Sequence, residues 1–287
     1  MKKIKLLLIL FCTSITLFWS CETQVEITEL VDGAEGVAIY SYISEINKIH
    51  SVSVTRVLSA LVKGPPLEED YVIKNAKVEL SDGQGAKADL IYVPENLEYE
   101  IPAAGFSVVS GRRYFLKVTL EGEHYTASCS IPNDRIAGVS GVFRKDIGEF
   151  GSDLAEISFN DVPNRENYYA IIGEVISDSG NGFINDISST YFTDKDKDGE
   201  ALTTNFNFEL GSEDDTSNRL KVKIINVEKT LFNQLNNNIV SDNFLTNKAN
   251  PFVEPIVTQS NIIGTNSIGV FAGYQVMEKE IPIIYNK

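Results

Sequence analysis

The stretch YFLKVTLEGEHYTASCSI, residues 114–131, decides the fold. Its first half alternates apolar and polar side chains, which is the pattern of a β-strand with one buried face. Glu121-Gly122-Glu123 then supplies a short turn, and a second strand follows from His124 to Ile131. Two strands joined by so short a turn pair as an antiparallel hairpin. The stretch therefore predicts an antiparallel β-sheet.

The same alternation recurs along most of the chain. Many short strands separated by polar turns favour a sandwich over a parallel α/β fold. We therefore expect a mostly β protein with two β-sandwich domains, immunoglobulin- or transthyretin-like, at 37–133 and 134–287. One short helix is predicted at about 227–237, with Asn226 as its N-cap. The further strand segments are 51–55, 76–80, 155–159, 168–176, 206–210, 220–224 and 267–284.

The N-terminus has the pattern of an export signal. Three lysines within residues 2–5 precede an apolar run, Leu6 to Trp19, which is shorter than the roughly 20 residues that span a bilayer. Ser20 and Cys21 follow, and Leu17 to Cys21 resembles a lipobox. We expect residues 1–20 to be a lipoprotein signal peptide and Cys21 to carry acyl chains such as palmitate. The alternative is an ordinary cleaved signal with an incidental cysteine.

After the signal, residues 21–36 are acidic and predict a tether between lipid and fold. Removing residues 1–20 takes away three lysines and no acid, so the net charge goes from −15 to −18. This charge argues against nucleic-acid binding, which needs clustered Lys and Arg. Cys129 is then the only cysteine besides Cys21, so no intramolecular disulfide is expected. We expect a lipid-anchored outer-membrane protein, with its periplasmic or surface-exposed side left open.

A series of short motifs is spread over most of the chain after the signal. These motifs are Asn75-Ala76-Lys77-Val78, Asp82-Gly83, Gly111-Arg112-Arg113-Tyr114-Phe115-Leu116, Tyr125-Thr126-Ala127, Ile131-Pro132, Asn167-Tyr168-Tyr169, Asn250-Pro251-Phe252, Glu254-Pro255, Ser260-Asn261-Ile262 and Gly269-Val270-Phe271. Their order resembles that of the Bacteroidota lipoproteins of domain-of-unknown-function family 4249. Two departures from the family pattern are Thr265-Asn266-Ser267, where a Gly-rich stretch is usual, and a shortened helix.

The resemblance implies a partner rather than a reaction. The family has no established activity, and its members are often encoded near TonB-dependent outer-membrane receptors. We therefore expect a non-enzymatic accessory or ligand-capturing partner of such an uptake system, without a catalytic residue. A structural or assembly role in the envelope is the first alternative, and a hydrolase is the second.

One local motif predicts a cation site. Asp194, Asp196 and Asp198 alternate and are followed by Gly199, as in a calcium loop whose carboxylates converge at a tight turn. The twelfth position is Asn205 instead of the bidentate Glu of an EF-hand. The alternative is a solvated acidic loop. Calcium is the only cofactor that the sequence suggests.

Two further patterns have an ordinary structural explanation. His124 and Cys129 lie five residues apart on one predicted strand, so their side chains are expected to point to opposite faces, which argues against a catalytic pair. Cys129 shares its face with apolar neighbours and is expected to be buried. Paired aromatics could form a sugar platform, but strand alternation explains them as core. These pairs are Tyr168 and Tyr169, Tyr191 and Phe192, and Phe206 and Phe208.

Overall fold

The computed structural model describes residues 36–57, 71–133, 136–147, 152–178, 188–210, 217–236 and 259–285. Within these ranges the protein is mostly β, as the alternation predicts, with one helix at 229–236. The strands in chain order are β1 (Gly36–Ile43), β2 (Ile49–Val57), β3 (Lys77–Ser81), β4 (Lys87–Val93), β5 (Glu98–Pro102), β6 (Arg113–Leu120), β7 (Glu123–Ser130), β8 (Ala137–Arg144), β9 (Asp153–Asn160), β10 (Tyr168–Ile176), β11 (Ser188–Thr193), β12 (Ala201–Phe208), β13 (Arg219–Val227) and β14 (Ser267–Pro282).

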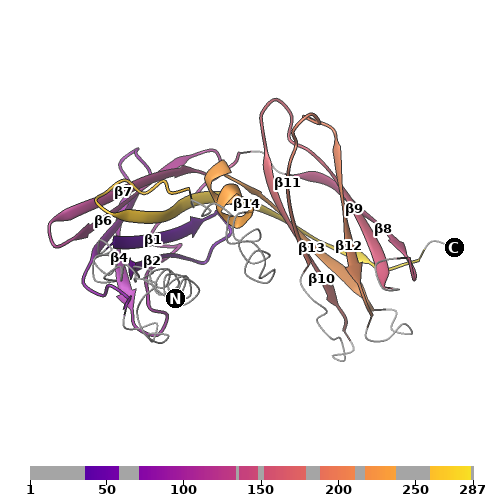
Figure 1. The fold of residues 1–287 in the computed structure, drawn as a ribbon, viewed down its shortest axis with the longest axis horizontal. Helices are drawn as coiled ribbons and strands as arrows, with labels where there is room; N and C mark the ends of the chain where they lie inside the picture. Colours follow the sequence, from indigo (N-terminus) through magenta and orange to yellow (C-terminus); the bar gives the residue numbers. More distant parts are fainter. Residues whose placement is uncertain are drawn as a thin grey trace, which may run out of the picture.

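The first lobe contains β1 to β7 and the first half of β14 (Figure 1). Its strands are hydrogen-bonded in the order β14-β1-β2-β5-β4-β3-β6-β7, and β7 in turn contacts β14, so the sheet curls around one core. Alternate side chains of β6, among them Tyr114, Leu116 and Val118, are buried in this core. The hairpin of β6 and β7 is confirmed. Its turn residues Glu121 and Gly122 have φ of 50° and 90°, which matches the twist of the paired strands.

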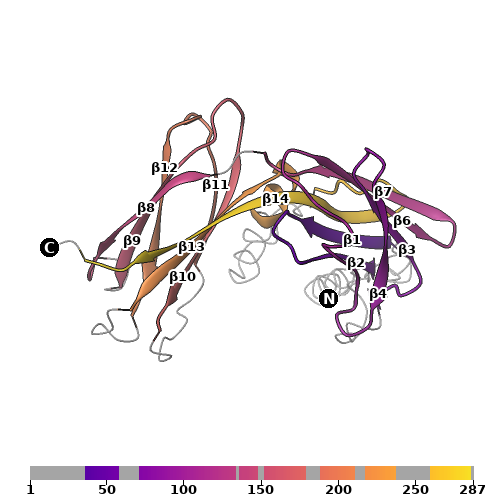
Figure 2. The same cartoon turned by 180° about the vertical axis from the view of Figure 1, so that it is seen from behind.

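The second lobe is a sandwich of two sheets. One is the three-stranded antiparallel sheet β12-β9-β8. The other contains β11, β10, β13 and the second half of β14, and apolar side chains from both sheets form a second core. Phe159 of β9 and Tyr169 of β10 meet edge to face in that core, with ring centroids 5.0 Å apart. Figure 2 shows the two layers from behind.

One strand, β14, belongs to both lobes. From Ser267 to Gly273 it pairs in parallel with β1, and from Tyr274 to Pro282 it pairs antiparallel with β13. Both views show it running through the junction (Figures 1 and 2). The 267–273 segment therefore completes a sheet that is otherwise built from residues 36–130.

The parallel pairing requires glycine at position 269. Gly269 has φ of +125°, and a Cβ built there would lie 1.9 Å from the carbonyl oxygen of Ile39 on β1. No L-residue with a side chain fits that space without moving β1, and the backbone conformation itself favours glycine. Gly269 thus allows the backbones of β14 and β1 to approach closely.

The helix packs at the junction between the lobes. Its Leu231 and Phe232 form a third apolar cluster with Tyr168 of β10 and with Val270 and Ala272 of β14. This cluster joins the helix to the shared strand and to the second lobe.

The prediction that Asn226 caps the helix is wrong. Asn226 lies within β13, and its Nδ2 donates a hydrogen bond to Oδ1 of Asn167 at 3.2 Å. Glu228 directly precedes the helix, and its carboxylate accepts from the backbone N–H groups of Ser130 at 2.7 Å and Gly273 at 3.0 Å. Glu228 thereby ties β7 and β14 to the start of the helix.

Candidate metal centre

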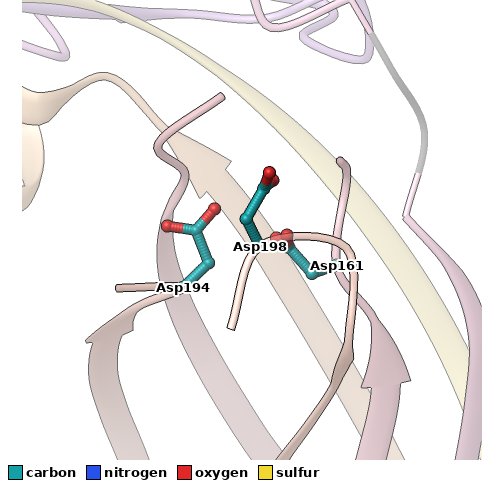
Figure 3. A group of neighbouring side chains, drawn as sticks. All are labelled: Asp161, Asp194 and Asp198. Atoms are coloured by element: carbon teal, nitrogen blue, oxygen red, sulfur yellow. The ribbon is translucent and has the colours of Figure 1, made fainter. Parts of the chain in front are cut away.

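Three aspartates converge at one end of the second lobe. Asp161 follows β9, whereas Asp194 and Asp198 lie in the loop between β11 and β12. Each offers one carboxylate oxygen, and these oxygens lie within 4.8 Å of one another. Asp161 and Asp194 are buried, whereas Asp198 is exposed. Figure 3 shows the three side chains on neighbouring loop segments.

Asn167 organises the buried part of this cluster. Its backbone N–H donates to both carboxylate oxygens of Asp194, at 3.0 Å each, and its Nδ2 donates to Asp194 Oδ2 at 3.1 Å and to the carbonyl oxygen of Val162 at 2.6 Å. Oδ1 of Asn167 in turn accepts from Nε of Arg165 at 3.0 Å and from Asn226. A buried carboxylate is tolerated when such donors replace water.

The other two carboxylates are held in the same manner. Asp161 Oδ1 accepts from the hydroxyl of Tyr169 at 2.5 Å, and Asp161 Oδ2 accepts from the backbone N–H of Gly199 at 2.8 Å. Burial, followed by the hydrogen bond to Asp161, raises the pKa of Tyr169 well above its ordinary value, so this hydroxyl stays protonated and donates. Asp198 Oδ1 accepts from the backbone N–H of Asn164 at 2.8 Å. The cluster therefore closes the β9–β10 loop onto the β11–β12 loop.

The structure changes the membership of the predicted cation loop. Asp194 and Asp198 lie in the convergent group, but Asp196 is exposed, has φ of +67° and is outside that group. Two backbone hydrogen bonds form the turns of this loop. The N–H of Lys197 donates to the carbonyl oxygen of Asp194 at 2.7 Å, and the N–H of Glu200 donates to the carbonyl oxygen of Lys197 at 2.9 Å. The third converging acid is Asp161, which is 33 residues before Asp194 in the chain.

The sequence patterns could not identify Asp161 as a member of the cluster, because only the packing of β9 beside β12 brings it to the loop. Asp161 N–H donates to Glu200 O at 3.0 Å, which continues the β9–β12 pairing past the strand ends. Asn205, at the twelfth position of the predicted loop, is exposed within β12 and pairs with Glu156. A strand therefore follows the loop where an EF-hand would continue into a helix.

Chemically, the site offers hard oxygen ligands of the kind that calcium takes. Six to eight oxygens complete a calcium shell. Both oxygens of Asp194 already accept hydrogen bonds, as do both oxygens of Asp161. The described geometry thus gives these carboxylates a structural role in joining two loops, and the calcium site remains a prediction.

Cys129 is a buried thiol on the inner face of β7, as predicted. Its side chain is 2% exposed, and Tyr125, Ala127 and Ile131 are buried in the same core. Burial raises the pKa of the Cys129 thiol well above its ordinary value, so a reactive thiolate is disfavoured. His124 is exposed on the opposite face, where its Nδ1 lies 3.1 Å from Oγ1 of Thr119. The two side chains do not form a catalytic pair.

The paired aromatics are core residues, which confirms the ordinary explanation over a sugar platform. Phe206 and Phe208 point into the second core with Tyr169 and Phe192. Tyr168 belongs to the junction cluster, where its ring lies 5.2 Å from that of Phe232. The sixth member, Tyr191, packs against the same cluster.

A family model described as domain of unknown function DUF4249 matches residues 22–280. The chain belongs to this family. The match includes both lobes and ends within β14, two residues before that strand ends, so the DUF4249 region comprises nearly the whole two-lobed fold. No curated protein matches the chain.

The predicted export signal, Cys21 and the 21–36 tether precede or adjoin the start of β1. Residues 1–35 lie outside the described part of the chain, and so does the family motif at 250–255. Within the described part, none of the helical residues forms a segment of the length and apolarity required to cross a membrane.

Proposed function

We propose that this DUF4249 chain is an exported lipoprotein, anchored to the outer membrane by acyl chains on Cys21. The observation that carries this proposal is the sequence of residues 2–21. It combines a lysine-rich start, a short apolar run, a small residue and a cysteine at the cleavage point. Several acyl chains on one residue provide stable anchoring, since each buried methylene contributes about 0.8 kcal/mol.

In the same proposal, the β-rich region is a non-enzymatic accessory or ligand-capturing partner of a TonB-dependent uptake system. Two structural observations argue against a catalytic role for the groups that could carry one. The thiol of Cys129 is buried with a raised pKa, and the carboxylates of Asp161 and Asp194 accept hydrogen bonds from their own chain. The receptor partner rests on what the family resemblance implies.

Lipid anchoring is tested by Cys21→Ala in the full chain, with Cys12→Ala as the matched control. Cys12 is also a cysteine of the N-terminal segment, but it lies inside the apolar run. We expect Cys21→Ala to abolish partition into the detergent phase, because the acyl acceptor is lost, and Cys12→Ala to partition like the parent. A Cys21→Ala protein that still enters the detergent phase would show that Cys21 is not the anchor.

The partner is tested by mild crosslinking of the native chain in membranes, followed by affinity purification and mass spectrometry. We expect a β-barrel receptor of the outer membrane to be recovered in comparable molar amount. A structural role predicts instead that loss of the chain weakens the envelope on every nutrient. Recovery without any receptor, together with such a general defect, would favour the structural role.

A further inference from the structure

A groove lies between the outer face of the β6–β7 hairpin and residues 260–263, which precede β14. The backbones of Thr126 and Ile263 exchange hydrogen bonds of 2.9 and 2.8 Å, which hold this segment beside β7. Gly264 allows the close approach, because a Cβ at that position would lie 2.3 Å from the ring of Tyr125. The groove has a volume of about 540 Å³, within the range of small-molecule sites. Its lining residues are Phe115, Thr126, Ala127, Ser128, Ser260, Asn261, Ile262 and Ile263.

Two large apolar side chains of this lining are open to solvent. Phe115 is 39% exposed and Ile263 is 73% exposed. Phe115 lies on the outer face of β6, because Tyr114 and Leu116, its neighbours in the strand, are buried in the first core. One exposed apolar residue needs no explanation, but two that line the same groove provide apolar surface for a ligand.

An arginine lies at the border of the groove. Nη2 of Arg113 donates to Oγ of Ser128 at 2.7 Å, and its guanidinium carbon lies 5.5 Å from the centre of the Phe115 ring. Both of these partners line the groove. Although the net charge of the chain is −15, no carboxylate of the described residues forms an ion pair with Arg113. Burial raises the pKa of Glu228 and Arg113 partly offsets this by its charge, but the Glu228 carboxylate already accepts from two backbone N–H groups.

Hydroxyl groups supply further donors beside the guanidinium. Oγ of Ser128 accepts from Arg113, and Oγ of Ser260 accepts from the backbone N–H of Ile262 at 3.2 Å. A hydroxyl that accepts one hydrogen bond keeps its own proton as a donor, and a guanidinium has five N–H donors in a planar fork. This set of donors matches a carboxylate, which only accepts and which an arginine binds through two parallel hydrogen bonds.

The edge of β7 is already in use, which argues against an added polypeptide strand. Thr126 gives both of its backbone groups to Ile263, and the carbonyl oxygen of Ser128 accepts from Nδ2 of Asn261 at 3.3 Å. The backbone N–H of Ser130 donates to Glu228 at 2.7 Å. Strand addition requires a row of free backbone groups at a sheet edge. The groove therefore offers its side chains to a ligand and suits a small molecule.

From these contacts we infer that the groove binds a small organic carboxylate with an aromatic or branched aliphatic body. The carboxylate accepts from the guanidinium of Arg113 and from the hydroxyl of Ser128. The apolar body lies against Phe115 and Ile263. The inference does not depend on lipid anchoring or on a receptor, so it can fail or succeed separately from the proposed function.

The test is a titration of the full chain, purified in detergent, with two acids whose binding is followed by ligand-detected NMR. The acids are phenylacetate and 4-methylpentanoate, and empty detergent micelles provide the baseline. The neutral controls are phenylacetamide and 4-methylpentanamide, which keep the apolar body and remove the charge. We expect saturable binding of at least one acid, weakened by added salt, and at least tenfold weaker binding of its amide. The peptide acid acetyl-Gly-Phe, with a free terminal carboxylate, represents a polypeptide source of the same chemistry.

Two variants and two matched controls locate the binding. Arg113→Met keeps the length of the side chain and removes the charged donor, and it should lower the affinity for the acid about tenfold or more. Its control is Arg144→Met, which removes an arginine that pairs with Glu156 in the second lobe. Ile263→Ser should weaken the binding of acid and amide severalfold, because apolar contact is lost. Its control is Ile91→Ser, which changes a residue of β4 that is 75% exposed and lies outside the lining.

The inference is overturned if neither acid binds, or if each amide binds as tightly as its acid. It is also overturned if Arg144→Met and Ile91→Ser lose as much affinity as Arg113→Met and Ile263→Ser. Tighter binding of the peptide acid than of both small acids would overturn the assignment to a small molecule. Should Ile263→Ser fail to fold, Arg113→Met decides, because the side chain of Arg113 is exposed.

Discussion

Replacing Asn167 with alanine should strongly destabilise the second lobe. The amide of Asn167 donates to the carbonyl of Val162 and to the buried carboxylate of Asp194, and accepts from Asn226. Alanine keeps the backbone bond to Asp194 but removes all of these. A buried polar group left without its partner costs about 1–3 kcal/mol. Since partial repair by neighbours is expected, we predict a net loss of about 3–4 kcal/mol.

The assay is thermal unfolding of the full chain, followed by circular dichroism. A loss of 1 kcal/mol lowers Tm by about 2–4 °C in domains of this size, so the melting temperature should fall by roughly 10 °C. The matched control is Asn205→Ala, which removes an exposed side chain from β12 and should change stability by less than about 0.5 kcal/mol. A fall of less than about 1 kcal/mol for Asn167→Ala would refute the reasoning that this amide secures the two loops.

Three further predictions concern the shared strand, the junction and the acidic cluster. Gly269→Ala should lower the free energy of unfolding by a few kcal/mol or prevent folding, because the new Cβ would meet a backbone oxygen at 1.9 Å. The control is Gly85→Ala, where φ is similar at +120° but the space around the new Cβ is open. It should lower the free energy of unfolding by about 1–3 kcal/mol in the same thermal unfolding assay. Burial raises the pKa of Glu228, so the folded state favours its protonated form, and stability should fall as pH rises from the ordinary pKa of 4.5 through the higher folded value. Glu228→Gln should remove this slope from pH-dependent urea titrations. The effect of calcium is measured as the difference in Tm between millimolar calcium and a chelator at fixed ionic strength. We expect this difference to be no larger in the parent than in a variant carrying Asp161→Asn and Asp198→Asn. A rise in Tm confined to the parent would establish a calcium site.

Local signals predicted nine of the fourteen strands in the described residues, because strand burial is often a two-residue pattern, and they missed β1, β4, β5, β8 and β11. The β10 strand has the bounds predicted from the sequence, Tyr168 to Ile176, and the turn of Glu121 and Gly122 has the conformation that its residues favour. Cys129 was placed correctly on the buried face for the same reason. In each case the determining residues are neighbours in the chain.

Features that depend on distant residues were missed. Asp161 joins Asp194 because β9 and β12 pair, and no motif near Asp161 indicates that contact. Asn226 has the residue type of a helix cap, but its amide donates a hydrogen bond to Asn167, the residue just before the neighbouring strand β10. The parallel pairing of β14 with β1 was also not predicted, because an apolar run such as 267–284 does not specify its partner.

The shared strand has a consequence for the order of folding. Val37 pairs with Ser267, so the first lobe is closed by a residue 230 positions later in the chain. Contacts between such distant residues are slow to form, because a long loop must be closed before they contribute. Neither core is complete until β14 has been synthesised and has docked. A nascent chain would therefore expose both half-formed cores to chaperones and proteases until β14 (Ser267–Pro282) emerges, and a truncation before residue 267 should leave two unfolded lobes instead of one.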